Sequence, residues 1–172
     1  KWDLFLELLE EARASEQKIV VYSQYLGMLD IIENHLKSAG IGYASLRGST
    51  RDRKEQIDLF SKDPTCEVFV ASLKAAGLGI DLTAASVVIH YDRWWNAARE
   101  NQATDRVHRY GQSRGVQVFK LVTKNTFEER IDQIIERKKN LFEEAIAIDD
   151  HEVIKSFTRD ELFELLQYQE PS

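Results

Sequence analysis

The chain has 172 residues, of which 43% are hydrophobic, and its formal net charge is −6. This length allows one substantial core with a tail and is too short for two comfortable domains. No apolar run approaches the ~20 residues needed to cross a bilayer, and the start lacks a secretion signal, so we expect no membrane partner. The first residue, Lys1, is not methionine, which suggests that the chain was excised or processed from something longer.

The overall acidity hides an uneven charge distribution. Between Arg93 and Lys124 seven Arg or Lys residues accompany two acids, whereas from Leu141 onward nine acids accompany two basic residues. A local basic surface counts for more than the average pI in nucleic-acid binding, so a nucleic-acid partner is compatible with this sequence. The single cysteine, Cys66, excludes a disulfide framework, and no histidine has metal-ligand spacing, so we predict no metal site.

Hydrophobic periodicity predicts helices and strands that alternate along the chain. Apolar residues at helical spacing predict a first helix over 2–15 and a second over 26–39, which Gly40 ends. Ser49 is a plausible N-cap for a third helix that stops near Pro64. The other predicted elements are strands over 19–22, 43–46, 67–71, 87–91 and 116–122, and helices over 97–109, 127–142 and 158–167.

This order of elements predicts an α/β fold. Short apolar strands separated by helices indicate a three-layer sandwich, in which a mostly parallel sheet is covered by helices on both faces, with further C-terminal helices. The adjacent aspartates within 148–151 mark the one candidate joint. We therefore expect a domain over 1–147 and an acidic helical tail over 148–172.

Four polar segments follow predicted strands. Ligands of open parallel sheets bind beyond the carboxyl ends of the strands, where these segments gather. Hydroxyls, free backbone amides and basic side chains there can grip phosphates without reading bases. Each segment alone is better explained as an ordinary loop, but their convergence favours a phosphate-tracking surface. The four segments are Ser23-Gln24, Arg47-Gly48-Ser49-Thr50, Ser72-Leu73-Lys74 and Asp92-Arg93-Trp94-Trp95.

Trp94 and Trp95 come just after a strand, where two large exposed rings are costly. At least one ring should pack in the core. The other ring, exposed beside Arg93, would be able to stack on a base or brace a backbone, although core packing of both fits the spacing equally well.

The predicted helix over 97–109 carries two stripes. One stripe is polar and basic and the other packs, because 3.6 residues per turn align Arg99, Gln102, Arg106 and Arg109 separately from Ala103, Val107 and Tyr110. A solvated face is the alternative, supported by the favourable spacing of Asp105 and Arg109. Two arginines one turn apart nevertheless suit a polyphosphate.

Gly77 and Gly79 in the loop over 75–81 permit close backbone approach to a nucleotide. The loop is neither a dinucleotide fingerprint nor a P-loop, and no Gly-Lys-Ser or Gly-Lys-Thr occurs in the sequence. Nothing would therefore cradle β- and γ-phosphates or bind their Mg²⁺. Arginine fingers often serve a nucleotide that is held elsewhere, so a partner lobe is implied.

The stretch 102–112, QATDRVHRYGQ, closely resembles the last helicase motif of SWI/SNF-type ATPases in helicase superfamily two. The stretch 72–85, SLKAAGLGIDLTAA, resembles the preceding motif, and 88–96, VIHYDRWWN, is similar to the segment between the two. The stretches 18–25 and 46–50 resemble early motifs of the second lobe. The resemblance covers residues 1 to about 148 and is closer to archaeal and bacterial members than to chromatin remodellers.

The resemblance implies a RecA-like second lobe of a double-stranded DNA translocase. Its partners would be duplex DNA and the N-terminal RecA-like lobe of the same polypeptide, which would hold ATP and Mg²⁺, so this chain alone should not hydrolyse ATP. The location would be intracellular: cytoplasm or nucleoid in a prokaryote, nucleus in a eukaryote. Arginine fingers would be Arg106 and Arg109. Nucleotide contacts would come from Gln102, Gly77, Gly79 and Asp81, and DNA contacts from Ser23, Gln24, Arg47, Gly48, Ser72, Lys74, Trp94 and Trp95.

Two positions depart from the family's usual pattern. Ala76 stands where glycine is usual and Asp81 where asparagine is more common, so only the contact by Asp81 is carried over. Two other functions are compatible with parts of the sequence. One is an RNA helicase lobe of the DEAD-box kind, whose last motif normally ends in Arg-Gly-Arg rather than Arg-Tyr-Gly-Gln. The other is a degenerate lobe kept for protein interaction, against which the intact Arg106 and Arg109 argue.

Overall fold

The computed structural model describes residues 1–76, 79–108, 115–138, 155 and 157–166. Five strands form one sheet, all of whose neighbouring pairs are parallel, in the order β2-β3-β1-β4-β5. This architecture confirms the predicted α/β fold. The strands are β1 (Ile19–Ser23), β2 (Gly42–Leu46), β3 (Cys66–Ser72), β4 (Val87–His90) and β5 (Gln117–Lys120).

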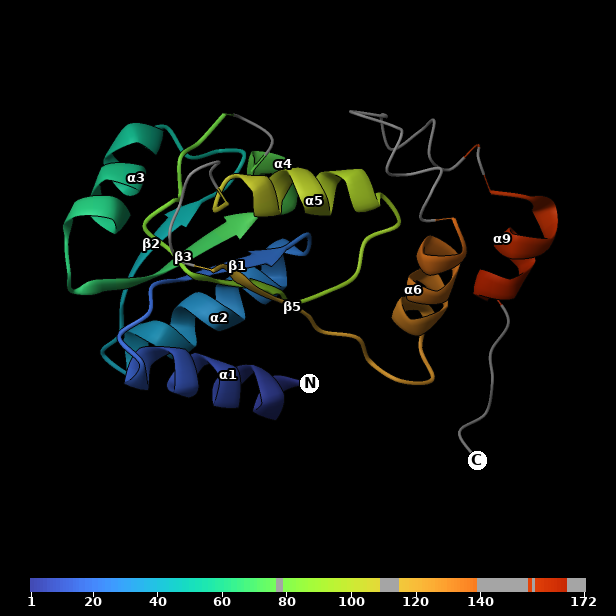
Figure 1. The fold of residues 1–172 in the computed structure, drawn as a ribbon, viewed down its shortest axis with the longest axis horizontal. Helices are drawn as coiled ribbons and strands as arrows, with labels where there is room; N and C mark the ends of the chain where they lie inside the picture. Colours follow the sequence, from blue (N-terminus) through green and yellow to red (C-terminus); the bar gives the residue numbers. More distant parts are fainter. Residues whose placement is uncertain (77–78, 109–114, 139–154, 156, 167–172) are drawn as a thin grey trace.

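Helices cover both faces of the sheet (Figure 1). One face carries α1 (Trp2–Ala14) and α2 (Leu26–Ser38), and the other carries α3 (Arg53–Lys62), α4 (Leu73–Ala76) and α5 (Ala97–Asp105). Beyond the β5 side, α6 (Phe127–Arg137) and α9 (Arg159–Leu166) lie beside each other. Among the described residues, none of the helices has the length and apolarity to pass through a bilayer.

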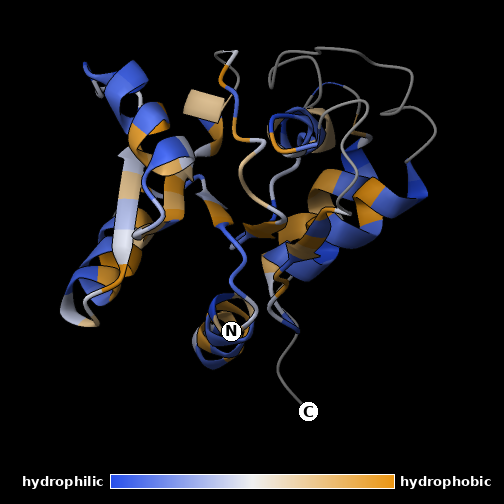
Figure 2. Cartoon of the chain, turned by 60° about the vertical axis from the view of Figure 1, so that its left-hand side comes forward, coloured by the Kyte–Doolittle hydropathy of each residue, from blue (hydrophilic) through white to orange (hydrophobic). Residues whose placement is uncertain are grey.

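The central strand β1 is buried along its whole length because helices cover both of its faces. Alternate residues point to opposite faces, so Ile19 and Val21 pack toward α1 and α2 while Val20 and Tyr22 pack toward α3, α4 and α5. In Figure 2 the inner strands are largely orange and hydrophobic, β2 is paler, and the outer sides of the helices are blue and hydrophilic. Two separate cores therefore sandwich the sheet.

A third cluster lies away from the sheet. Ile131, Ile134 and Ile135 of α6 pack with Phe157 and with Leu165 of α9. The predicted C-terminal helix thus has α6 as its partner, which the sequence left open. The predicted joint over 148–151 lies outside the described residues.

Several element boundaries differ from those predicted: α6 ends at Arg137 rather than at 142, β5 covers only Gln117–Lys120, and three further differences have a visible cause. The third helix begins at Arg53 rather than after Ser49, because the Thr50 hydroxyl accepts the Arg47 N–H at 2.8 Å and closes a turn first. A short helix, α4, replaces the start of the predicted loop, since the Ser72 hydroxyl accepts the Ala75 N–H at 3.2 Å.

The third difference concerns the end of α5. This helix ends at Asp105 instead of 109, and the Arg106 carbonyl accepts the Leu82 N–H at 2.9 Å. At this end the backbone bonds tighten to i→i+3, because the Arg106 and Val107 N–H groups donate to the Ala103 and Thr104 carbonyls.

Cys66 and His90 are both buried. Burial raises the pKa of Cys66 to about 11. The His90 ring stacks on Tyr22 with ring centroids 5.3 Å apart, and its Nε2 lies 2.9 Å from the Thr104 hydroxyl. Burial, aided by the charges of Lys120 and Arg93, lowers the pKa of His90 to about 3.

The pKa of His90 predicts an acid-dependent loss of stability. An unfolded histidine titrates near ~6.5, so protonation favours unfolding as the pH falls below that value and levels off only near the folded pKa of about 3. This effect reaches about 2 kcal/mol at pH 5. We expect His90→Gln to reduce the loss of unfolding free energy between pH 7 and pH 5 by that amount in urea titrations. An equal loss in both proteins would contradict a buried, neutral imidazole.

Gly42 is required by close backbone packing between β2 and β3. A Cβ atom at this position would lie 2.0 Å from the Thr65 carbonyl oxygen. We expect Gly42→Ala to lower the free energy of unfolding by about 1–3 kcal/mol, because backbone must move to admit the methyl group. Gly48→Ala is the matched control, since nothing lies within 4 Å of its added Cβ, and it should be neutral or slightly stabilising.

Candidate functional site

The predicted polar segments converge on one edge of the sheet. Ser23 and Ser72 end neighbouring strands as register partners, and Arg47 directly follows β2. Asp92 follows β4 and contacts the segment after β1. The parallel strands thus bring the predicted loops to the same edge of the sheet. The geometry of these loops alone does not identify a ligand.

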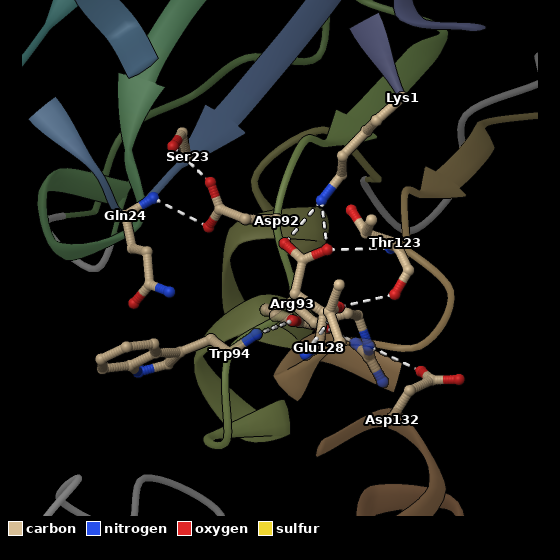
Figure 3. A network of polar contacts seen from close by, with 11 residues as sticks. Lys1, Ser23, Gln24, Asp92, Arg93, Trp94, Thr123, Glu128 and Asp132 are labelled. Carbon is tan, nitrogen blue, oxygen red and sulfur yellow. Dashed lines mark hydrogen bonds and ion pairs between the residues drawn. The ribbon is translucent and has the colours of Figure 1, made fainter. Parts of the chain in front are cut away.

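Asp92 joins the ends of two strands through its carboxylate (Figure 3). The Ser23 hydroxyl donates to Oδ2, and the Gln24 backbone N–H donates to Oδ1 at 3.2 Å. The residue is only 3% exposed. Burial raises the pKa of Asp92, while the hydrogen bonds from Ser23 and Gln24 oppose that rise. The Asp92 carboxylate therefore links the end of β1 to the segment after β4 through hydrogen bonds.

Arg93 is the cation of a buried ionic cluster. Its Nη1 donates to Glu100 of α5, and both side chains are almost fully buried. Its Nε lies 2.7 Å from Asp132 of α6, an ion-pair contact too bent to be a hydrogen bond. Glu100 also accepts the Trp94 N–H at 3.0 Å and lies 3.2 Å from Lys120 Nζ. The Arg93 guanidinium is buried against Glu100, so it does not lie as an exposed cation beside the indoles.

The two tryptophans stack on each other, with ring centroids 3.7 Å apart and planes 28° apart. Both are half-buried. Trp94 packs against the core beneath α4 and α5, whereas Trp95 packs against the cluster of α6 and α9. Neither ring is therefore a fully buried core residue or a fully exposed platform.

Several predicted DNA contacts already have partners within the chain. The Ser23 and Ser72 hydroxyls are buried and bonded to Asp92 and the Ala75 N–H. Arg47 pairs with Asp30 at 2.7 Å and Glu33 at 2.9 Å. Burial acts to lower the pKa of Arg47, but the hydrogen bonds to Glu33 and Asp30 outweigh it and raise the value.

The groups at this edge that face solvent are different ones. Lys74 and Gly48 are exposed, and Gln24 is half-buried. Arg47, Trp94 and Trp95 are also half-buried, so of the predicted DNA contacts only Lys74 and Gly48 are exposed.

The predicted nucleotide contacts gather at the end of α5. Gln102 is exposed on this helix, and Arg106 is its C-terminal cap. The loop that carries Gly79 and Asp81 is held against this end by the hydrogen bond from Leu82 to the Arg106 carbonyl. Gly79 has a φ of +70°, which justifies glycine there, and Asp81 accepts the Thr83 N–H at 3.1 Å. Arg109 and Gly77 lie outside the described residues.

Arg106 has an unsatisfied donor. Its Nε is buried and has no hydrogen-bond partner in the part of the chain that the structure describes. Burial raises the pKa of Tyr22, and the positive charge of Arg106 opposes this rise. Arg106 as a whole is half-buried, so part of this side chain remains accessible at the end of α5 although its Nε is not.

Hydrogen bonds from three directions hold α5 in place. The Asn96 side chain caps its first turn, the Tyr22 hydroxyl donates to the Ala103 carbonyl at 3.0 Å, and Thr104 bonds to His90. The link from Glu100 to Arg93 adds a fourth anchor, which sequence reasoning missed. The available signal was the position of Glu100 on the same helical face as buried Ala97 and Ala103, where a carboxylate requires a cation.

Acidic residues and histidines do not form a metal site within the described ranges, where no group of three or more metal-ligating side chains occurs. The site consists instead of two separate neighbourhoods at one edge, one around the β1, β2 and β3 loops and one around the end of α5.

Residues 1–111 match the helicase conserved C-terminal domain. An uncharacterized ATP-dependent helicase from Mycoplasma pneumoniae is 41% identical over 169 residues, which cover 97% of this chain and 16% of that protein. The chromatin-remodeling ATPase INO80 of Emericella nidulans is 42% identical over 142 residues, which cover 81% of this chain and 8% of that protein. The chain thus spans a small part of these relatives.

The solved structure of a Sulfolobus solfataricus SWI2/SNF2 ATPase core in complex with double-stranded DNA matches with a TM-score of 0.71 and 36% identity. The match covers 98% of this chain and 35% of that one. The five-stranded parallel sheet agrees with these likenesses. The chain belongs to the helicase C-terminal domain family and is the C-terminal, RecA-like lobe of a SWI2/SNF2-type ATPase.

Proposed function

We propose that this chain is the second motor lobe of an ATP-dependent translocase on double-stranded DNA. It works with a first RecA-like lobe of the same polypeptide, which holds ATP and Mg²⁺. Arg106 and Arg109 reach the ATP from this side, while the loops after β1, β2 and β3 grip the DNA backbone. The chain alone does not hydrolyse ATP.

The position of half-buried Arg106 as the C-cap of an anchored helix, one turn after exposed Gln102, is the observation that carries this proposal. Four anchors fix the backbone of α5, which supports a defined position for Arg106 before any ligand arrives. A positioned arginine stabilises the charge that develops during phosphoryl transfer without reorganising at that moment. Gln102 lies one turn before Arg106, and the loop with Gly79 and Asp81 is held beside it, so these residues complete the nucleotide-facing surface.

The DNA-binding part rests on exposed groups that gather at the same edge. Lys74 supplies an exposed positive charge on α4, and Gly48 and Gln24 supply accessible backbone or amide groups. Such groups contact phosphates without reading sequence, as a translocase requires. The Sulfolobus relative was solved with double-stranded DNA, which supports duplex DNA as the partner.

Arg106 tests the nucleotide role. In a protein that carries both lobes, we expect Arg106→Ala to lower DNA-stimulated ATP turnover by about 10³-fold, with ATP affinity changed little. Arg106→Lys should restore little activity, because lysine cannot form the planar fork. Arg159→Ala on α9 is the matched control and should leave turnover unchanged. Unchanged turnover in Arg106→Ala would contradict the proposal.

Lys74 tests the DNA role. We expect Lys74→Ala to raise the duplex concentration that gives half-maximal ATPase stimulation. It should also reduce the slope of log affinity against log salt by about 1, because one phosphate contact is lost. Lys37→Ala removes the same charge from the last turn of α2, at the opposite edge of the sheet, and serves as the control. If the two variants weaken DNA stimulation equally, the effect comes from the loss of positive charge anywhere on the lobe and not from a phosphate contact by Lys74.

The choice of polymer tests the class of motor. ATP turnover of the two-lobe protein is measured with duplex DNA, single-stranded DNA and RNA at one salt concentration. Duplex DNA should stimulate most. Stimulation by RNA alone would overturn the proposal in favour of an RNA helicase lobe.

A further inference from the structure

Asp92 is an acid at an edge where phosphates are proposed to bind. A carboxylate there opposes anion binding by simple electrostatics, and its burial raises its pKa. The reason for an acid at this position therefore lies in the hydrogen bonds that the Asp92 carboxylate accepts. Both oxygens accept hydrogen bonds at the end of β1: the Ser23 hydroxyl donates to one, and the N–H of Gln24, the next residue, donates to the other.

The segment that Asp92 holds leads directly into α2. The Ser23 hydroxyl oxygen also accepts the Tyr25 N–H at 3.1 Å, and Tyr25 is the N-cap residue of α2. Gln24 lies between these two anchored residues. Figure 3 shows its side chain extending away from Asp92, while its backbone N–H points toward the carboxylate. The carboxylate thus fixes the backbone of Gln24 and leaves its amide available.

The next residue, Arg93, connects the same stretch of backbone to α5. Arg93 binds Glu100 of α5 and Asp132 of α6. Consecutive side chains therefore point to the loop after β1 and to the helix that presents Arg106. One short stretch of backbone sets the position of both, because both side chains are buried and bonded.

We propose that Asp92 is a positioning residue for DNA binding, which holds the backbone of Ser23 and Gln24 in the shape that contacts a duplex phosphate. This inference rests on the proposed function, since it takes DNA as the ligand of the loop after β1. Asp92 itself touches no phosphate. Its role is exerted through the two hydrogen bonds that it accepts.

Two substitutions separate the hydrogen bonds from the charge. Asp92→Ala and Asp92→Asn both remove the negative charge, but asparagine keeps an oxygen that can accept the Gln24 N–H. In the two-lobe protein, ATP turnover is measured against the concentration of a duplex, which gives the maximal rate and the half-saturating DNA concentration. Asp3→Ala, an exposed acid on α1, is the control for net charge.

For Asp92→Ala we expect the half-saturating DNA concentration to rise roughly five- to tenfold, with the maximal rate within about twofold of the parent. Asp92→Asn should keep most of the parent's affinity. Tighter binding by both variants alike would overturn the inference, because it would show that Asp92 acts only as a repelling charge. Equal weakening in both, or a loss confined to the maximal rate, would also overturn it.

Amide hydrogen exchange supplies a readout that is independent of catalysis. Exchange over residues 23–26 should accelerate in Asp92→Ala and much less in Asp92→Asn, with exchange in α1 unchanged. If exchange over residues 23–26 is unaltered in Asp92→Ala and the parent protein still shows DNA-stimulated turnover, the inference fails and the proposed function remains. A parent protein without DNA stimulation would instead fail the proposed function, and the inference with it.

Discussion

The buried pair of Arg93 and Glu100 is the interaction on which the arrangement of the site depends. Glu100 lies on the packed face of α5, and its carboxylate is satisfied by the Arg93 guanidinium, the Trp94 N–H and the Lys120 ammonium. Removing one partner of such a buried pair typically costs about 3–5 kcal/mol, because the other charge is left without compensation. The pair therefore fixes where α5 begins relative to the end of β4.

Other contacts then set the position of Arg106. From the beginning fixed by Glu100, α5 runs over the sheet, where Tyr22 and His90 bond its last turn. Its end meets the loop after α4 through Leu82. The Arg93 guanidinium, which binds Glu100 of α5, also contacts Asp132 of α6, and α6 packs with α9. Helix α5 and the C-terminal helices thus share one buried cation.

Much of the fold was predictable because it depends on local patterns. The strands are short apolar runs and the helices have 3.6-residue periodicity, so the parallel sheet and its two helical layers followed from the sequence. The gathering of Ser23, Arg47 and Ser72 at one edge followed from the parallel topology alone. The motif around Arg106 predicted the family correctly.

What escaped prediction depends on contacts between distant residues. The pairing of Arg47 with Asp30 and Glu33 joins a strand end to a helix, and no local pattern marks it. The end of α5 contacts a distant loop through Leu82, and Arg93 pairs both with Glu100 and with Asp132, 39 positions later. Side chains that looked available by composition were already committed within the lobe.

The stacked tryptophans have a spectroscopic consequence. Trp94 belongs to the core under α4 and α5, and Trp95 to the cluster of α6 and α9, yet their rings are 3.7 Å apart. Two indoles this close are electronically coupled, and their near-ultraviolet circular dichroism depends on the angle between them. The ring pair spans the seam between the sheet body and the C-terminal helices, so any sliding along that seam would change an optical signal that the protein already carries.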